Sequence, residues 1–160
     1  FPRLAGLSAD YLSKQLHDFQ SGKRLSPVMQ PLAKALSDSE ITSVTAAIAA
    51  MPAPAVPAIN RSRMPDGPGE KLALRGAWDR QIPECVSCHG PGGVGVGSAF
   101  PPLANQPAMY LAAQLNAWRD GTRHNDPNDL MGHIAKAMTE DEIKAVADYF
   151  STVGHKEVKP

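Results

Sequence analysis

An internal duplication limits what this 160-residue chain can fold into. Segment 1–24 aligns without a gap with segment 100–123, and 11 of the 24 positions are identical. After a three-residue insertion, segment 29–44 aligns with segment 131–146, with seven further identities. Phe-Pro, Tyr-Leu, Gln-Leu and Gly-x-Arg recur in the same order, which chance similarity between two alanine-rich helices does not explain. The sequence therefore predicts two copies of one structural unit.

Helix signals recur in both copies, and nothing in the chain predicts a strand. Ser8 is a predicted N-cap of a helix that runs to about Gln20. A capping box, in which Ser or Thr is followed three residues later by Glu, opens a later helix at 37–40 and again at 139–142. A further helix is expected over 70–81. The predicted fold class is all-α, with two tandem helical domains of which the first is incomplete at its N-terminus.

A proline-rich stretch separates the two copies. The segment from Met51 to Pro68 contains five prolines, whose fixed φ angle and missing amide donors disfavour both helix and sheet. We expect an extended linker over 52–68. The domain boundaries that follow are 1–51 for the first copy and 69–160 for the second.

Composition excludes several classes of protein. Lys and Arg number 16 and Asp and Glu also number 16, so no basic surface for nucleic acid is indicated. No apolar run approaches the roughly 20 residues that span a bilayer. The first residues show no secretory signal pattern, which leaves a cytosolic protein or an exported chain without its leader.

The two cysteines of the chain lie in one five-residue motif, Cys85-Val86-Ser87-Cys88-His89. Cys-x-x-Cys-His is the attachment signature of c-type haem. One helical turn presents both thiols to the two vinyl groups of a porphyrin, and the adjacent histidine can then bind the iron. Cys85 and Cys88 are therefore candidate thioether anchors, and His89 is the candidate axial ligand.

Three other interpretations of the motif stay open at this point. A zinc site needs about four ligands, and the remaining histidines form no second cluster in the sequence. A redox-active dithiol normally follows a strand, which the sequence does not predict. A disulfide between Cys85 and Cys88 would leave the role of His89 unexplained.

A second axial ligand, Met or His, is expected for a low-spin electron carrier. The candidates in the second copy are Met109, Met131, Met138, His124, His133 and His155. Met131 alone aligns with a residue of the same ligand chemistry in the first copy, Met29, and it follows an irregular loop. Met131 is the predicted ligand, and Met138 is the next choice.

Two features follow the motif. The glycine-rich segment 90–100 lacks the Gly-Lys-Ser/Thr ending of a phosphate loop, and we expect it to pass close to a flat macrocycle. Pro101 is a candidate to offer its carbonyl oxygen to the Nδ1 of His89, which would fix the orientation of the imidazole. The alternative is that Pro101 only forms a loop turn.

The residues CVSCHG, FPPLA and NDPNDLMGHIAKAMTEDEIKAVADYF resemble the class I c-type cytochromes. The tandem copies resemble the two-domain, dihaem cytochromes of the c-four type. The resemblance implies haem c on Cys85 and Cys88, with His89 and Met131 as axial ligands. It also implies an exported, periplasmic electron carrier of a respiratory chain, with a terminal oxidase as a frequent partner and no catalytic residues of its own.

The chain departs from that pattern in its first copy. The histidine that matches His89 would fall before residue 1, so Met29 is an orphaned or vestigial ligand. Removal of the first Cys-x-x-Cys-His motif by truncation is expected rather than its loss from the lineage. One covalent haem is expected on this chain, and a second in the untruncated parent.

Two functions follow from this interpretation, together with a third, less favoured one. The first is a soluble electron-transfer protein with a six-coordinate haem. The alternative is a haem-bearing electron-acceptor subunit or domain of a dehydrogenase or a sulfur-oxidising enzyme. Peroxidase-like catalysis or gas sensing would require an open distal position on the iron.

Overall fold

The computed structural model describes residues 1–153, and within them the chain is built from helices, short 3-10 turns and loops. The described residues contain isolated β-bridges but no sheet, so the predicted all-α fold class is confirmed. The helices are α1 Ala9–Ser21, α2 Met29–Lys34, α3 Asp38–Ala49, α4 Pro68–Arg75, α5 Cys85–His89, α6 Ala108–Arg119, α7 Leu130–Ala137 and α8 Glu140–Thr152. Three single 3-10 turns lie at Trp78–Arg80, Pro91–Gly93 and Pro127–Asp129.

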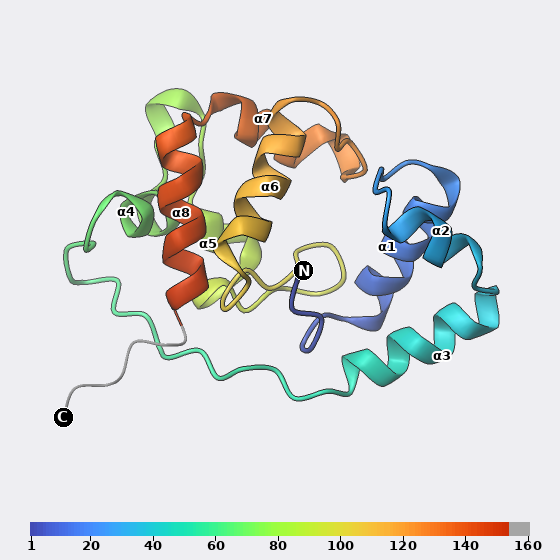
Figure 1. Cartoon of the computed structure of the whole chain (residues 1–160). Helices are drawn as coiled ribbons and strands as arrows, with labels where there is room; N and C mark the ends of the chain where they lie inside the picture. The colour runs from blue at the N-terminus through green and yellow to red at the C-terminus, as the bar shows by residue number, and fades with distance from the viewer. Residues whose placement is uncertain (154–160) are drawn as a thin grey trace.

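The two sequence copies form two groups of helices that lie side by side (Figure 1). Helices α1 to α3 form one group, in which α1 packs against both α2 and α3. Helices α4 to α8 form the other, in which α8 packs against α4 and α6, and α6 packs against α7. Figure 1 shows the start of the chain between the two groups, beside the loop that precedes α6.

The second group has a continuous apolar core. Glycine at position 69 allows α4 to cross α8 closely, because a Cβ there would lie 2.0 Å from the carbonyl oxygen of Ala145. Ile82 and Ile143 are fully buried in this core, and Phe150 of α8 is nearly so. Burial of such side chains is the main source of stability for a small helical domain.

Both predicted capping boxes are present. Ser37 accepts the backbone N–H of Glu40 at the start of α3, and Thr139 accepts that of Glu142 at the start of α8. Each glutamate in turn accepts the backbone N–H of its capping residue. Ser8 also caps α1, as its position predicted. These local signals fix the starts of three helices at the positions that the sequence indicates.

The helix expected over 70–81 is shorter than predicted. Helix α4 ends at Arg75, since Gly76 adopts a φ of 67° and a ψ of −166°, which no helix contains. The chain then forms a loop in which Ala77 and Ile82 exchange backbone hydrogen bonds of 2.8 and 3.1 Å. The prediction was therefore wrong for 76–81, because the glycine ends the helix.

The proline-rich segment forms no helix or strand over 52–67 and makes a turn at 61–62, and it is not a free tether. Val56 and Ile59 pack against the core of the second group. A Cβ at Gly92 would lie 2.7 Å from Val56, and one at Gly6 would lie 2.7 Å from the Cβ of Ala53. The segment thus runs along the surface of both groups, and at its end Pro68 is the first residue of α4.

A polar cluster joins the two groups at equivalent residues of the duplication. Arg24 donates to the side-chain oxygens of Gln15 and Gln114, at 2.8 Å each. Arg123 donates to the same two oxygens, at 3.4 and 2.7 Å. Arg24 also donates to the hydroxyl of Tyr110 at 3.0 Å. The two arginines are both buried and form an antiparallel bridge, so this interdomain cluster has an approximate two-fold symmetry.

No helix in the described residues is long and apolar enough to cross a membrane.

Candidate functional site

The Cys-x-x-Cys-His motif forms a helix of its own, α5, which packs against α4. Cys85 and Cys88 are both free and partly buried. Burial raises the pKa of the Cys85 thiol to about 12, so this group is a neutral thiol at physiological pH. Among residues 1–153, no three His, Cys, Asp or Glu side chains gather into a metal-binding cluster.

His89, the last residue of α5, is held by the loop before α6. Its Nδ1 lies 2.7 Å from the carbonyl oxygen of Pro101, so the protonated Nδ1 donates this bond. The hydrogen bond anticipated for Pro101 is present in the structure. Since Nδ1 is engaged, Nε2 is the nitrogen left to bind a metal. Burial lowers the pKa of His89, partly offset by the Pro101 bond, which favours the neutral imidazole that can coordinate iron.

The glycine-rich segment after His89 packs tightly against protein. The N–H of Gly95 donates to the carbonyl oxygen of His89 at 2.7 Å, and a Cβ at Gly95 would lie 2.7 Å from Pro102. A Cβ at Gly93 would lie 2.8 Å from the ring of Phe150. These glycines bring α5 against the loop that carries Pro101, and their expected contact with a macrocycle stays a prediction.

Met131, the predicted second ligand, is the second residue of α7 rather than part of the loop itself. Asp126 fixes its backbone, since one carboxylate oxygen accepts the N–H of Met131 at 2.7 Å. The other oxygen accepts the indole N–H of Trp118 at 2.9 Å, which ties the start of α7 to α6. Met131 is half-buried, so its side chain is neither enclosed in the apolar core nor fully exposed to solvent.

The other candidate ligands lie in different environments. Met138 is 6% exposed and belongs to the apolar core of the second group. Met109 is 87% exposed, and the side chains of His124 and His133 are exposed as well. His155 lies outside the described residues. In the first group, Met29 begins α2 and is half-buried.

A hollow of about 510 Å³ lies between the segment that enters α5 and the first turns of α7. Pro83, two residues before Cys85, forms part of one wall, and Leu130, next to Met131, forms part of the other. Its volume is that of a typical cofactor pocket. Its lining residues are Trp78, Gln81, Pro83, Asn128, Asp129, Leu130, His133 and Ile134.

These features fit a covalently bound haem. The chain offers two free thiols at the required spacing, a neutral imidazole with Nε2 available, and a thioether on an anchored helix start. Asp126, which fixes the backbone of Met131, was not among the residues predicted from the sequence. Its sequence signal was available, because an acidic residue just ahead of a helix start commonly accepts backbone N–H groups there.

Comparison with known proteins finds close relatives among electron carriers. The chain is 66% identical to the thiosulfate dehydrogenase electron acceptor of Stutzerimonas stutzeri, over 98% of this chain and 73% of the relative. It is 43% identical to the protein of the same name from Thiomonas intermedia, over 94% of this chain and 70% of the relative. It is 37% identical to cytochrome c4 of Pseudomonas aeruginosa, over 93% of this chain and 74% of the relative.

Solved structures of similar proteins share the arrangement of both groups. A thiosulfate dehydrogenase from Marichromatium purpuratum, in its as-isolated form, superposes with a TM-score of 0.84 at 46% identity. The match covers 94% of this chain but 32% of the longer one, so this chain spans about a third of that enzyme. Reduced cytochrome c4 from Pseudomonas stutzeri superposes with a TM-score of 0.84 at 32% identity, over 96% and 85% of the two chains.

The family model for cytochrome c matches residues 69–154, the segment that contains both α5 and Met131. The resemblance to the two-domain c-four type noted in the sequence is confirmed by the cytochrome c4 relatives and structures. The chain therefore belongs to the cytochrome c family, and it is an electron carrier with covalently bound haem c rather than a catalyst in its own right.

Proposed function

We propose that this chain accepts electrons from a thiosulfate dehydrogenase, one electron at a time, on a haem c held by Cys85 and Cys88. His89 and Met131 are the axial ligands in this proposal, and Pro101 orients the imidazole. Haem supplies the Fe(III)/Fe(II) couple that stores each electron. The choice favours the electron-acceptor function, which the sequence analysis gave as the alternative, over a carrier between unspecified partners.

One observation carries the proposal. Both groups of helices superpose on part of a thiosulfate dehydrogenase from Marichromatium purpuratum, at a TM-score of 0.84 and 46% identity. In that protein a segment similar to this chain is continuous with the rest of the dehydrogenase. Two curated relatives carry the name of electron acceptor for such an enzyme. No relative compared above has a name that points to a terminal oxidase, the other partner expected from the sequence.

The chain's own residues support a carrier rather than a catalyst. The bond from His89 to Pro101 and the anchoring of Met131 by Asp126 hold the two proposed ligands in place. Trp78 is 65% exposed beside the hollow, and Leu130 on the opposite wall is also exposed. The net charge is zero before any haem propionates are counted, so long-range electrostatic steering of a partner is weak. A small apolar contact around the hollow suits a transient encounter between redox proteins.

Three further points belong to the proposal. The functional domain boundaries are 1–51, 52–68 and 69–160, with the haem site in the last. The protein acts after export to the periplasm, as is usual for c-type cytochromes. One haem is bound to this chain, and a parent with a second Cys-x-x-Cys-His motif would bind a second one near Met29.

The experiment that tests the partner is a reduction assay. The oxidised, haem-loaded chain is mixed with a thiosulfate dehydrogenase, and haem absorbance is followed after addition of thiosulfate. Fast reduction that requires both the enzyme and thiosulfate is the expected result. A cytochrome c4 from Pseudomonas aeruginosa serves as the matched control carrier. Reduction no faster than that of the control would contradict a dedicated electron-acceptor role.

The haem count is tested separately by intact mass. We expect one haem added to the full chain, and loss of stable covalent haem in the double variant Cys85→Ser, Cys88→Ser. A chain matured with haem but with no increase in mass would contradict the assignment of Cys85 and Cys88.

A further inference from the structure

The first residues of the chain are hydrogen-bonded to the loop that orients His89. The backbone N–H of Arg3 donates to the side-chain oxygen of Gln106 at 2.9 Å, and the Gln106 amide donates back to the Arg3 carbonyl at 2.8 Å. The guanidinium of Arg3 donates to the carbonyl oxygen of Ala104 at 2.9 Å. Gln106 is buried, so this reciprocal pair is shielded from solvent. Residues about 100 positions apart are thus joined by three hydrogen bonds.

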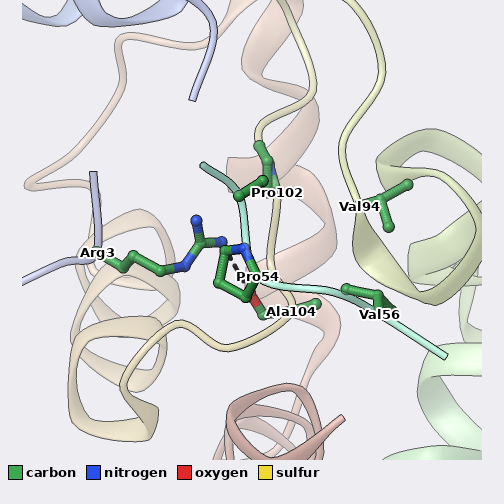
Figure 2. A pocket seen from close by; sticks show the side chains of 7 residues that line it. Arg3, Pro54, Val56, Val94, Pro102 and Ala104 are labelled. Carbon is green, nitrogen blue, oxygen red and sulfur yellow. Dashed lines mark hydrogen bonds between the residues drawn. The ribbon is translucent and has the colours of Figure 1, made fainter. Parts of the chain in front are cut away.

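The charge of Arg3 lies in a small pocket against this loop. Figure 2 shows the guanidinium beside Pro54, with its bond to Ala104. The pocket has a volume of about 80 Å³ and is otherwise lined by apolar side chains and prolines. The Nε of Arg3 is buried without a hydrogen-bond partner in the described residues. No salt bridge to Arg3 is found among residues 1–153, so its positive charge is not neutralised by a carboxylate there.

The same loop contacts His89 from its other end. Pro101 accepts the bond from the Nδ1 of His89, and Arg3 binds Ala104 three residues later. Pro102, between them, lies against Gly95, whose N–H is bonded to the carbonyl of His89. The path from the guanidinium to the imidazole therefore consists of four consecutive residues, 101–104, and two hydrogen bonds.

The duplication shows that this link is one-sided. Segment 1–7 and segment 100–106 adopt the same turn, with a bond of 3.1 Å from Leu7 to Leu4 and one of 3.1 Å from Gln106 to Leu103. In that alignment the counterpart of Arg3 is Pro102 and the counterpart of Gln106 is Leu7. Neither counterpart side chain can donate a hydrogen bond. The first copy therefore places a positive charge against the second copy, and the second copy places no equivalent charge against the first.

We propose that Arg3 is a positioning residue that raises the reduction potential of the haem bound at His89, through the loop 101–104. The inference rests on the proposed assignment of His89 as an iron ligand. A cation held against the loop that orients His89 disfavours the ferric state of a haem bound there, because the ferric state carries one more positive charge than the ferrous state. The charge of Arg3 therefore favours the reduced haem.

The test compares charge-removing and charge-retaining variants of the full, haem-loaded chain. Arg3→Gln keeps an amide donor and removes the charge, and Arg3→Lys keeps the charge. Lys23→Gln, at an exposed lysine, is the control for a change in net charge alone. Potentiometric titration should show a lower potential in Arg3→Gln, by at least a threefold change in the equilibrium constant, ~28 mV for one electron. Arg3→Lys and Lys23→Gln should each shift it less.

A second variant separates the hydrogen-bond link from folding. Gln106→Leu places the residue of the first copy into the second, and it should lower the potential in the same direction because Arg3 loses its anchor. Thermal unfolding of every variant is followed in parallel. Equal potentials in Arg3→Gln and Arg3→Lys, or a loss of stability with no change in potential, would overturn the inference. If the unsubstituted chain carries no covalent haem, the proposed haem site is overturned together with this inference. If the variants bind haem covalently and their potential is unchanged, this inference alone is overturned.

Discussion

The two copies of the duplicated unit share sequence landmarks but not surroundings. Val44 of α3 is 39% exposed, whereas its counterpart Val146 of α8 is 3% exposed. In the second copy α4 packs along α8, and α5 with its loop completes the core. Among residues 1–153, α3 has its main helix contact with α1. The first position of the apolar pattern is buried in both copies, as Ile41 and Ile143, whereas the next position is half-exposed in the first copy and core in the second.

In the interdomain cluster, by contrast, equivalent residues of the two copies have similar surroundings. Gln15 and Gln114 accept from both Arg24 and Arg123, so equivalent residues have nearly equivalent partners. The glutamines and arginines that are identical in both copies form contacts between the copies. The apolar helix residues that are identical in both copies form contacts within one copy. The comparison separates residues that join the halves from residues that build the haem-binding half.

The largest effect is expected from the two aligned methionines. Met131→Ala should abolish the weak charge-transfer band of Met-ligated ferric haem, because it removes the thioether. Met29→Ala should leave the band unchanged. Absorption spectra of the oxidised variants check this. Met138→Ala is the matched control, since its side chain lies in the core and its loss should lower stability while the band survives. Loss of the band in Met138→Ala instead would reverse the ligand assignment.

The next effect concerns the aligned pair Phe150 and Ile48. Phe150→Ala should cost about 3–5 kcal/mol of unfolding free energy, since the ring is almost fully buried and contacts the loop at Gly93. Ile48→Ala should cost less than about 2 kcal/mol, because this side chain is only half-buried. Denaturant unfolding of the haem-loaded variants measures both. Equal costs would mean that the two helices are equally covered in solution.

The symmetric cluster predicts a smaller and balanced effect. Arg24→Ala and Arg123→Ala should each cost about 1.5–3 kcal/mol, the range for hydrogen bonds to charged groups. Burial and the nearby Arg24 charge both lower the pKa of Arg123, so each substitution also relieves repulsion. The double variant should therefore differ from the sum of the single ones, as a double-mutant cycle would show. Additive costs would indicate two independent contacts.

The smallest effect is a pH dependence at the two capping-box glutamates. The ion pair with Arg80 is the main cause that lowers the pKa of Glu142, whereas hydrogen bonds from Ser37 lower that of Glu40. A depressed carboxyl pKa stabilises the fold above the usual Glu value and loses that contribution as pH falls through the folded value. Arg80→Ala should raise the pKa of Glu142 and leave that of Glu40 unchanged, in carboxyl titration by NMR. Acid unfolding should then begin at a higher pH.

Much of the fold could be predicted from local signals. The duplication, the capping boxes and the Cys-x-x-Cys-His motif are encoded over short stretches, so the helix starts and the position of α5 follow from the sequence. The helix expected over 70–81 was overextended. The φ angle of Gly76, which ends α4, depends on the loop between Ala77 and Ile82, and no local helix signal reports that loop.

The candidate site was partly accessible in the same way. Cys85, Cys88 and His89 follow from their spacing, and Met131 was selected by comparison with Met29. Asp126 was missed, although its place before α7 is a local signal. The contacts of Arg3 with Gln106 could not be predicted, because residues 103 positions apart meet only when the two copies pack together. Long-range polar contacts of this kind leave no periodic trace in the sequence.

The packing of the proline-rich segment bears on whether the two halves stay together after the chain is cut. Since Val56 and Ile59 are packed on the second group and the interdomain cluster joins the halves separately, the peptide bonds of 52–68 are not what holds the halves together. A single protease cut in this segment should yield two fragments that co-elute as one particle. Lengthening the segment with glycine and serine, by contrast, would displace Val56 from its contact with Gly92. The segment would therefore tolerate being nicked better than being extended.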